Sequence, residues 1–96
     1  MLYVLICTDK PDAGELRQMV RPEHVAYLNS LGTQLKAAGP FTDEDGKPTG
    51  SLVIVEAEDR QAAGKIADND PYAKAGLFRS VEIRGWKWTI KNPENA

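Results

Sequence analysis

Runs of apolar residues separated by polar segments predict four strands along the chain. Residues 2–7 and 51–57 are almost entirely apolar and rich in strand-forming side chains, which is typical of strands that are buried on both faces. Residues 33–38 alternate weakly between apolar and polar side chains and predict a half-exposed strand that ends before Gly39 and Pro40. A fourth strand is predicted over residues 80–90, after a hairpin loop at residues 42–50 and a helical region.

Apolar residues recur at helical spacing between residues 15 and 31 and predict the first helix. Pro22 interrupts this pattern, so we expect either a kink or a short helix followed by a new helix that starts at Pro22. His24 lies on the apolar face of this helix and should therefore point toward the sheet. The apolar residues that share this face are Tyr27, Leu28 and Leu31.

Two further helical segments are predicted between residues 59 and 78. Asp59 is a suitable N-cap for a helix whose buried face consists of small residues. Asp70 precedes Pro71, a combination that favours a helix start, because the carboxylate can accept from a free N–H group and proline loses no hydrogen bond there. Gly76 then permits a tight exit from this one-turn element.

The alternation in the last predicted strand slips by one residue. Apolar side chains occupy odd positions before Gly85 and even positions after it: Val81, Ile83, Trp86, Trp88 and Ile90. A β-bulge near Gly85 would keep all five on one face, whereas an unbroken strand would turn the tryptophans to the other face, toward a partner. The polar residues 91–96 are expected to fray.

The predicted order of elements is βαββαβ within a single domain that covers residues 1–96. Right-handed crossovers then give an α+β fold, with a four-stranded antiparallel sheet and both helices on one face. Because two strands are apolar on both faces, the face without helices needs a cover. A second copy of the chain, packed sheet to sheet as a two-fold homodimer, would supply it.

Composition narrows the classes of function. The net charge is −2 and the isoelectric point is about 5.3, whereas a nucleic-acid site or an anionic membrane surface requires a basic excess. The single cysteine, Cys7, cannot form an internal disulfide and suits a reducing cytosol. The first apolar run is too short for a signal peptide or a membrane span. We therefore expect a cytoplasmic protein without nucleic-acid or membrane partners.

No motif in the sequence predicts a metal or a cofactor. Residues 43–46 begin like a calcium loop but lack its third acidic position and its distant glutamate, and residues 46–48 lack the Ser or Thr of a P-loop. One histidine and one cysteine cannot build a tetrahedral zinc site. Cys7 is expected in the core, and Ser51 opens a strand without the Gly-x-Ser-x-Gly turn of a hydrolase. An RNA-recognition motif is excluded because residues 51–57 lack stacking aromatic residues.

His24 and Asp70 remain as the candidate chemistry. On the residues alone, the simpler interpretation is a hydrogen-bonded histidine and a helix cap. In the functional interpretation, Asp70 accepts from one imidazole nitrogen and leaves the other as a general base or acid near neutral pH. Arg21 would then bind an anionic group, or is only a solvated surface charge. The candidates for substrate binding are Arg21, Tyr27, Phe41, Ser51 and Tyr72.

Several short segments in this order resemble the YciI-like (YCII-related) family from residue 1 to about residue 90. These segments are MLYV and the Asp-Lys loop after its strand, VRPEH at residues 20–24, AAGP at 37–40, TGS at 49–51 and ADNDPYAKAGLF at 67–78. One departure is Gly85 before Trp86, where many members of the family have proline.

The resemblance implies a ferredoxin-like α+β subunit that forms a dimeric α/β barrel, related to muconolactone isomerase and antibiotic-biosynthesis monooxygenases. It also implies an active site with a conserved His and Asp, which map onto His24 and Asp70. The best-understood relative is a dehydrochlorinase of chlorinated hydroxyquinols.

Together these observations predict an enzyme that uses His24 and Asp70 for cofactor-independent acid/base chemistry. The expected reaction is elimination, dehydrochlorination or isomerisation of a small cyclic or aromatic compound. The alternative is a non-enzymatic dimeric module of the same fold that binds a ligand or a partner protein.

Overall fold

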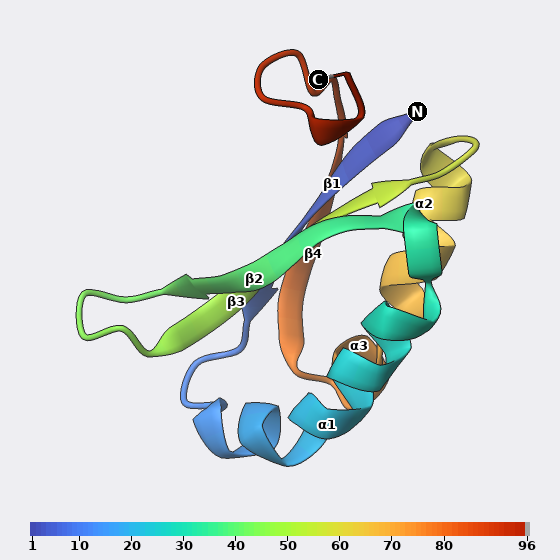
Figure 1. Cartoon of the computed structure of the whole chain (residues 1–96). Helices are drawn as coiled ribbons and strands as arrows, with labels where there is room; N and C mark the ends of the chain where they lie inside the picture. The colour runs from blue at the N-terminus through green and yellow to red at the C-terminus, as the bar shows by residue number, and fades with distance from the viewer. Residues whose placement is uncertain (96) are drawn as a thin grey trace.

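The computed structural model describes residues 1–95 and contains the predicted βαββαβ order with additional short helical turns (Figure 1). The elements are β1 (Leu2–Asp9), α1 (Gly14–Ser30), the 3₁₀ turn η1 (Gly32–Gln34), β2 (Leu35–Thr42), β3 (Pro48–Glu56), α2 (Arg60–Asp68), α3 (Pro71–Lys74), β4 (Phe78–Trp86) and the 3₁₀ turn η2 (Pro93–Asn95).

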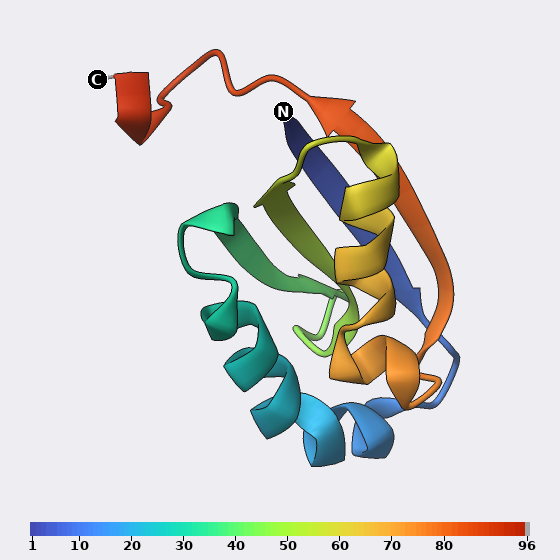
Figure 2. The ribbon, with the colours of Figure 1, turned by 90° about the vertical axis from the view of Figure 1, so that its right-hand side faces the viewer.

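The four strands form one antiparallel sheet in the order β2-β3-β1-β4. The helices lie on one face of this sheet, as Figure 2 shows, with α1 beside β2 and β3 and α2 beside β1 and β4. The main core lies between the two layers, where Leu5, Val53 and Val55 of the sheet pack with Leu28 of α1 and Ala63 of α2. This is the α+β ferredoxin-like arrangement expected from the element order.

The other face of the sheet is uncovered by helices and is largely apolar over β1, β2 and β3, whereas Glu82 and Arg84 of β4 also lie on it. Because strand residues alternate between faces, the partners of Val4 and Ile6 identify this outer face. Its apolar residues are Leu2, Val4, Ile6, Ala37, Phe41, Leu52, Ile54 and Trp86. In the single chain, four of these residues are half-buried, Ala37, Phe41 and Trp86 are exposed, and Ile54 is buried. The two apolar strands are therefore covered more completely on the helix side.

Strand β2 starts and ends later than the alternation predicted. Residues 33 and 34 belong to the 3₁₀ turn, and the strand runs through Gly39 and Pro40 to Thr42. Proline interrupts a central strand because it cannot donate to both neighbours, but β2 is an edge strand and has a neighbour on one side only. The hairpin loop is therefore shorter than predicted, since β3 already begins at Pro48.

The β-bulge predicted near Gly85 is wrong. Pairing between β1 and β4 is regular from Cys7 opposite Val81 to Leu2 opposite Trp86, and the register shift lies between Thr8 and Asp9 instead. Strand β4 ends at Trp86, which lies opposite Leu2, the first residue of β1. Trp86 therefore lies on the outer face, as the alternative without a bulge predicted, and its ring centroid is 5.6 Å from that of Trp88.

Local signals located the helices well. Helix α1 continues through Pro22 without a break, and its axis bends along its length (Figures 1 and 2). Asp59 caps α2 by accepting from the Ala62 N–H, and Asp70 caps α3 by accepting from the Tyr72 N–H, so both predicted caps are confirmed.

The chain end crosses back to the opposite edge of the sheet. Glu94 forms an ion pair of 2.7 Å with Lys36 of β2, and whether residues 91–96 fray in solution stays a prediction. No helix within residues 1–95 has the length and apolar character to cross a membrane.

Candidate functional site

His24 and Asp70 form a buried hydrogen-bonded pair between α1 and the start of α3. The Nδ1 atom of His24 lies 2.8 Å from Oδ1 and 3.0 Å from Oδ2 of Asp70, and the two residues are only 9% and 5% exposed. An ionised carboxylate is only an acceptor, and Asp70 also accepts from the Tyr72 N–H. The hydrogen bond to Asp70 therefore places a ring proton on Nδ1, and Nε2 makes no hydrogen bond to the part of the chain that the structure describes.

Tyr72 holds the other side of the imidazole. Its ring stacks on His24 with the centroids 3.9 Å apart and an interplanar angle of 17°, and it meets Phe78 edge-on at 6.0 Å. The residue is fully buried with Val20 and Leu77 in a second apolar cluster. The hydrogen bond to Asp70 and the stacking on Tyr72 together fix the orientation of the imidazole ring.

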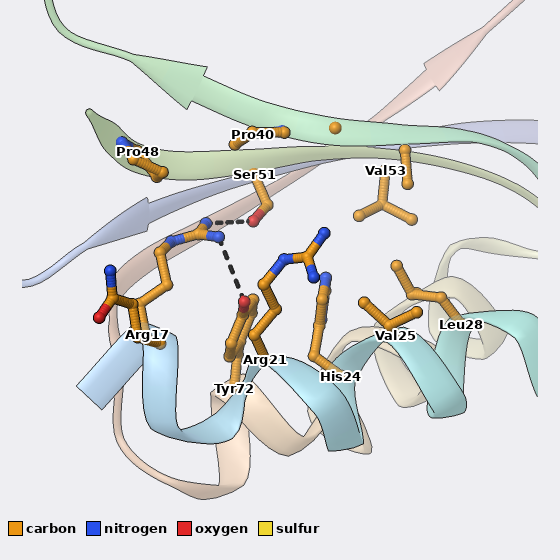
Figure 3. Close-up of a pocket in the computed structure, with 13 residues that line it drawn as sticks. Arg17, Arg21, His24, Val25, Leu28, Pro40, Pro48, Ser51, Val53 and Tyr72 are labelled. Atoms are coloured by element: carbon orange, nitrogen blue, oxygen red, sulfur yellow. Dashed lines mark hydrogen bonds between the residues drawn. The ribbon is translucent and has the colours of Figure 1, made fainter. Parts of the chain in front are cut away.

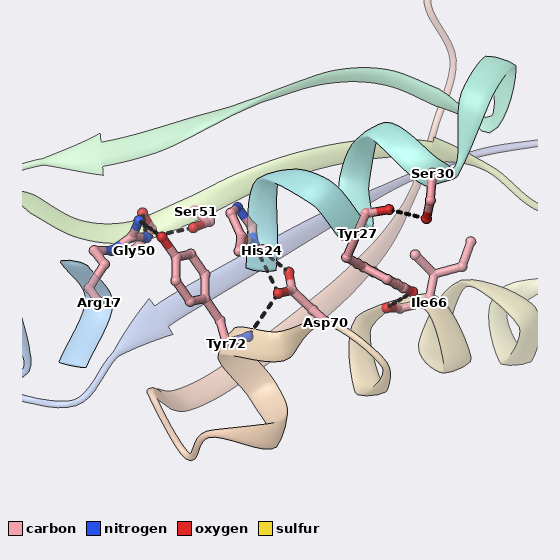
Figure 4. Close-up of polar contacts among 9 residues, drawn as sticks. All are labelled: Arg17, His24, Tyr27, Ser30, Gly50, Ser51, Ile66, Asp70 and Tyr72. Carbon is pink, nitrogen blue, oxygen red and sulfur yellow. Dashed lines mark hydrogen bonds and ion pairs between the residues drawn. The ribbon is translucent and has the colours of Figure 1, made fainter. Parts of the chain in front are cut away.

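Arg17 of α1 contacts residues of two strands and one other helix next to this pair, as Figure 4 shows in part. Its Nε donates to Asp9 Oδ2 at 2.9 Å, and its terminal nitrogens donate to the Gly50 carbonyl and Ser51 Oγ, both at 2.6 Å, and to Tyr72 Oη at 3.3 Å. Its guanidinium also lies over the Tyr72 ring, 4.7 Å from the centroid. The buried ion pair with Asp9 therefore joins α1 to β1, and the other hydrogen bonds of Arg17 join it to β3 and α3.

Gly50 is required for this arrangement. A Cβ atom at this position would collide with the backbone carbonyl of Cys7 on the neighbouring strand, so only glycine fits beside Ser51 in the TGS segment.

A pocket of about 350 Å³ opens between α1 and strands β2 and β3. Arg17 and Arg21 line it, and none of the lining residues is acidic. Because Asp9 pairs with Arg17, the cationic character of the pocket comes mainly from Arg21. The residues that line it are Arg17, Gln18, Arg21, His24, Val25, Leu28, Ala38, Gly39, Pro40, Pro48, Ser51, Val53 and Tyr72. Figure 3 shows the His24 ring pointing from α1 toward this space, with the Arg21 guanidinium beside it.

The predicted site residues separate into two groups. Four of them, His24, Arg21, Ser51 and Tyr72, line the pocket, and Asp70 lies behind His24. Tyr27 and Phe41 do not line it. Tyr27 packs against the main core and donates to the Ile66 carbonyl at 2.8 Å. It is adjacent to Leu28 in sequence and therefore points in a different direction from α1, toward α2. Phe41 faces the outer side of the sheet, where it borders a second hollow.

Sequence reasoning missed Arg17 and Asp9. Arg17 lies seven residues before His24, and both residues lie on the buried face of α1 with Val20 and Leu28. This helical spacing was a usable signal. Its partners could not be read from the pattern, because Asp9, Ser51 and Tyr72 are distant in sequence.

Burial also raises the pKa values of two groups near the His24–Asp70 pair, the Cys7 thiol and the Tyr72 hydroxyl. It raises the pKa of the Cys7 thiol to about 12, and the carboxylates of Asp70 and Asp9 add to this effect while Arg17 opposes it. Burial raises the pKa of Tyr72 as well, against the opposing charges of Arg17 and Arg21. Cys7 is therefore an unreactive core thiol at neutral pH, and the Tyr72 hydroxyl is protonated.

Comparison with known proteins places this geometry in a family. Residues 1–87 match the YCII-related domain. The chain belongs to the YCII-related domain family. It is 41% identical over 95 residues to protein YciI of Escherichia coli O6:H1, covering 91% of this chain and 97% of the relative. It is 38% identical over 95 residues, with the same coverage, to an uncharacterised protein of Haemophilus influenzae.

Solved structures share the fold. The chain superposes with a TM-score of 0.85 and 32% identity on 5-chloro-2-hydroxyhydroquinone dehydrochlorinase (TftG) of Burkholderia phenoliruptrix, in complex with 2,5-dihydroxybenzoquinone, over 96% of this chain and 99% of that one. SnoaB, a cofactor-independent oxygenase of Streptomyces nogalater, has a TM-score of 0.55 at 10% identity over 95% of this chain and 96% of that one, which is a likeness of fold alone.

Proposed function

We propose that the protein catalyses cofactor-independent acid/base chemistry on a small cyclic or aromatic compound. His24 is the general base or acid, and Asp70 orients its ring and stabilises the imidazolium. The observation that carries this proposal is that the two sides of the imidazole have different environments. Nδ1 is hydrogen-bonded to a buried carboxylate, while the ring lines a cationic pocket. A histidine that served packing alone would not need a free nitrogen beside an open space.

The similarity to the dehydrochlorinase TftG supports a hydroxylated ring as the substrate class. In the proposed step, Nε2 of His24 takes a proton from the substrate, and the electron pair left behind moves into the ring. In an elimination, a leaving group such as chloride departs with its electron pair. In an isomerisation, the imidazolium returns the proton at another atom. Neither route requires an oxidant or a reductant, and Arg21 offsets the negative charge of the intermediate.

The proposed active form is a cytoplasmic homodimer. The apolar outer face of the sheet is uncovered in the single chain, and a second copy packed on it would remove its side chains from water. The pocket opens on the helix side of the sheet, so such a dimer would leave it accessible.

Turnover assays with chlorinated and unchlorinated hydroquinones test the enzymatic proposal. The expected result is release of chloride, or a change in the ultraviolet spectrum of the ring, that is lost by at least about a hundredfold in His24→Gln. Asp70→Asn should reduce turnover as well, whereas the exposed Arg60→Gln on α2 should not. Full turnover in His24→Gln would contradict the assignment. If the native protein and His24→Gln bind a hydroquinone equally well and neither turns it over, the ligand-binding module is favoured instead.

A further inference from the structure

Arg17 determines the direction of two hydrogen bonds at the wall of the pocket. A guanidinium has donors and no acceptor, so the hydroxyls of Ser51 and Tyr72 both accept from Arg17. Each hydroxyl therefore has its own hydrogen free to point elsewhere. The charge on Arg17 also polarises both groups and makes them stronger donors.

Neither hydroxyl donates to another group within residues 1–95. Both belong to buried residues, 3% exposed for Ser51 and 0% for Tyr72, and both residues line the pocket. Figure 3 shows both oxygens joined to the guanidinium of Arg17 by hydrogen bonds, in the pocket that His24 also lines. Since burial raises the pKa of Tyr72, its hydroxyl keeps its hydrogen at neutral pH. A buried hydroxyl without an acceptor is costly unless a ligand supplies one.

We propose that the hydroxyls of Ser51 and Tyr72 form a donor pair that binds the substrate oxygen on which negative charge develops when His24 removes a proton. Arg17 is the positioning residue that aims both hydroxyls. This inference rests on the proposed acid/base function and deepens it, because it assigns the site that receives the charge. The arrangement acts like an oxyanion hole, in which fixed donors stabilise the transition state more than the neutral substrate.

The donor pair also narrows the substrate class. His24 must remove a proton from an atom whose remaining electron pair is conjugated with, or lies on, the oxygen that the pair binds. Such atoms are the hydroxyl oxygen of an enol or a phenol and a ring carbon next to a carbonyl. The electron pair from the broken O–H or C–H bond then localises on that oxygen, and the proton resides on Nε2. Compounds without such an oxygen are not substrates on this proposal.

The test uses 4-nitrophenol as the probe, because its phenolate absorbs visible light and its neutral form does not. The native protein should bind the phenolate in preference to the phenol and shift the ionisation of the bound probe toward the anion. Ser51→Ala and Tyr72→Phe should each weaken this preference about tenfold, since each removes one hydrogen bond to a charged oxygen. Both substitutions retain the core packing, because alanine fills the strand position and phenylalanine keeps the stack on His24.

Two control variants remove a tyrosine and a serine hydroxyl at positions outside the pocket. Tyr3→Phe, in the main core, and Ser80→Ala, on the exposed surface of β4, should leave the ionisation of the bound probe unchanged. The donor pair is contradicted if the native protein shows no preference for the phenolate, or if Ser51→Ala and Tyr72→Phe affect both forms of the probe equally.

His24→Gln separates this inference from the proposed catalytic function. It should keep the dependence of phenolate binding on Ser51 and Tyr72, because glutamine leaves the donor pair in place. A retained dependence supports the donor pair even if no compound is turned over, and turnover without any phenolate preference would reject the donor pair while leaving His24 as the base. Loss of the preference in His24→Gln would show that the histidine holds the anion and would contradict the donor pair.

Discussion

The imidazole of His24 lies flat on the ring of Tyr72, with the centroids 3.9 Å apart, so a residue of α1 and a residue of α3 orient each other. Asp70, two positions before Tyr72, holds the edge of the same imidazole. The one-turn helix α3 and its N-cap therefore supply both the hydrogen-bond partner of His24 and the ring surface on which the imidazole stacks.

The first prediction concerns the tautomer of His24. In the native protein the neutral ring should carry its proton on Nδ1, facing Asp70. In Asp70→Asn, the side-chain oxygen is expected to keep accepting from the Tyr72 N–H, so the amide NH₂ faces Nδ1 and donates to it. The proton should then move to Nε2. Long-range ¹H–¹⁵N correlation spectra can check this directly, because the chain has one histidine. The same tautomer in both proteins would mean that Asp70 does not select it.

The second prediction concerns the buried ion pair of Arg17 and Asp9. Arg17→Met should lower the free energy of unfolding by about 3–5 kcal/mol, because it leaves the Asp9 carboxylate buried without its partner. Asp9→Asn in the Arg17→Met background should recover part of this loss, since the amide carries no charge. Urea unfolding measures both effects. The exposed Arg60→Met on α2 is the matched control and should stay within about 0.5 kcal/mol of the native protein. A similar small loss for Arg17→Met would refute the structural role of the pair.

The third prediction concerns stability at alkaline pH. The pKa of Cys7 is raised from 9.0 to about 12 in the folded chain. Below pH 9.0 the thiol is protonated in both states and has no effect, but above it the unfolded chain loses the proton first. The free energy of unfolding should therefore fall by up to about 1.4 kcal/mol per pH unit from this group.

Cys7→Ala should lack this part of the slope, although it is less stable at every pH because it leaves a small cavity. The comparison is cleanest just above pH 9.0, since Tyr27 and Tyr72, whose pKa values are also raised, contribute only above their ordinary value of 10.0. Denaturant unfolding at several pH values measures the difference, and parallel slopes for the two proteins would count against a buried Cys7 thiol.

The fourth prediction concerns the proposed homodimer. Leu52→Glu places a charge opposite Ile6 and Gly39 on the outer face and should convert the proposed dimer into a monomer, because burying an unpaired carboxylate in the interface is costly. Sedimentation velocity at micromolar concentration measures the change. Met19→Glu, which changes an exposed apolar residue of α1 in the same way, should leave the dimer intact. A native protein that sediments as a monomer would remove the proposed interface.

The predicted strand boundaries show where pattern reasoning loses accuracy. The slip in alternation around Gly85 predicts either a bulge or an unbroken strand that turns the tryptophans to the other face, and β4 is paired without a bulge there up to Trp86. Side-chain alternation reports which face a residue occupies and carries no information on the length of the neighbouring strand. For the same reason Gly39 and Pro40 were read as the end of β2, although an edge strand tolerates them.

The sequence by itself determined the order of elements, the caps at Asp59 and Asp70 and the inward direction of His24, because each depends on residues a few positions apart. Only the tertiary structure decided that Arg17 joins Asp9, Ser51 and Tyr72, and that Tyr27 and Phe41 lie outside the pocket. Those contacts depend on how the helices pack on the sheet. Hydrophobic periodicity specifies that a face is buried and does not specify which distant side chains meet there.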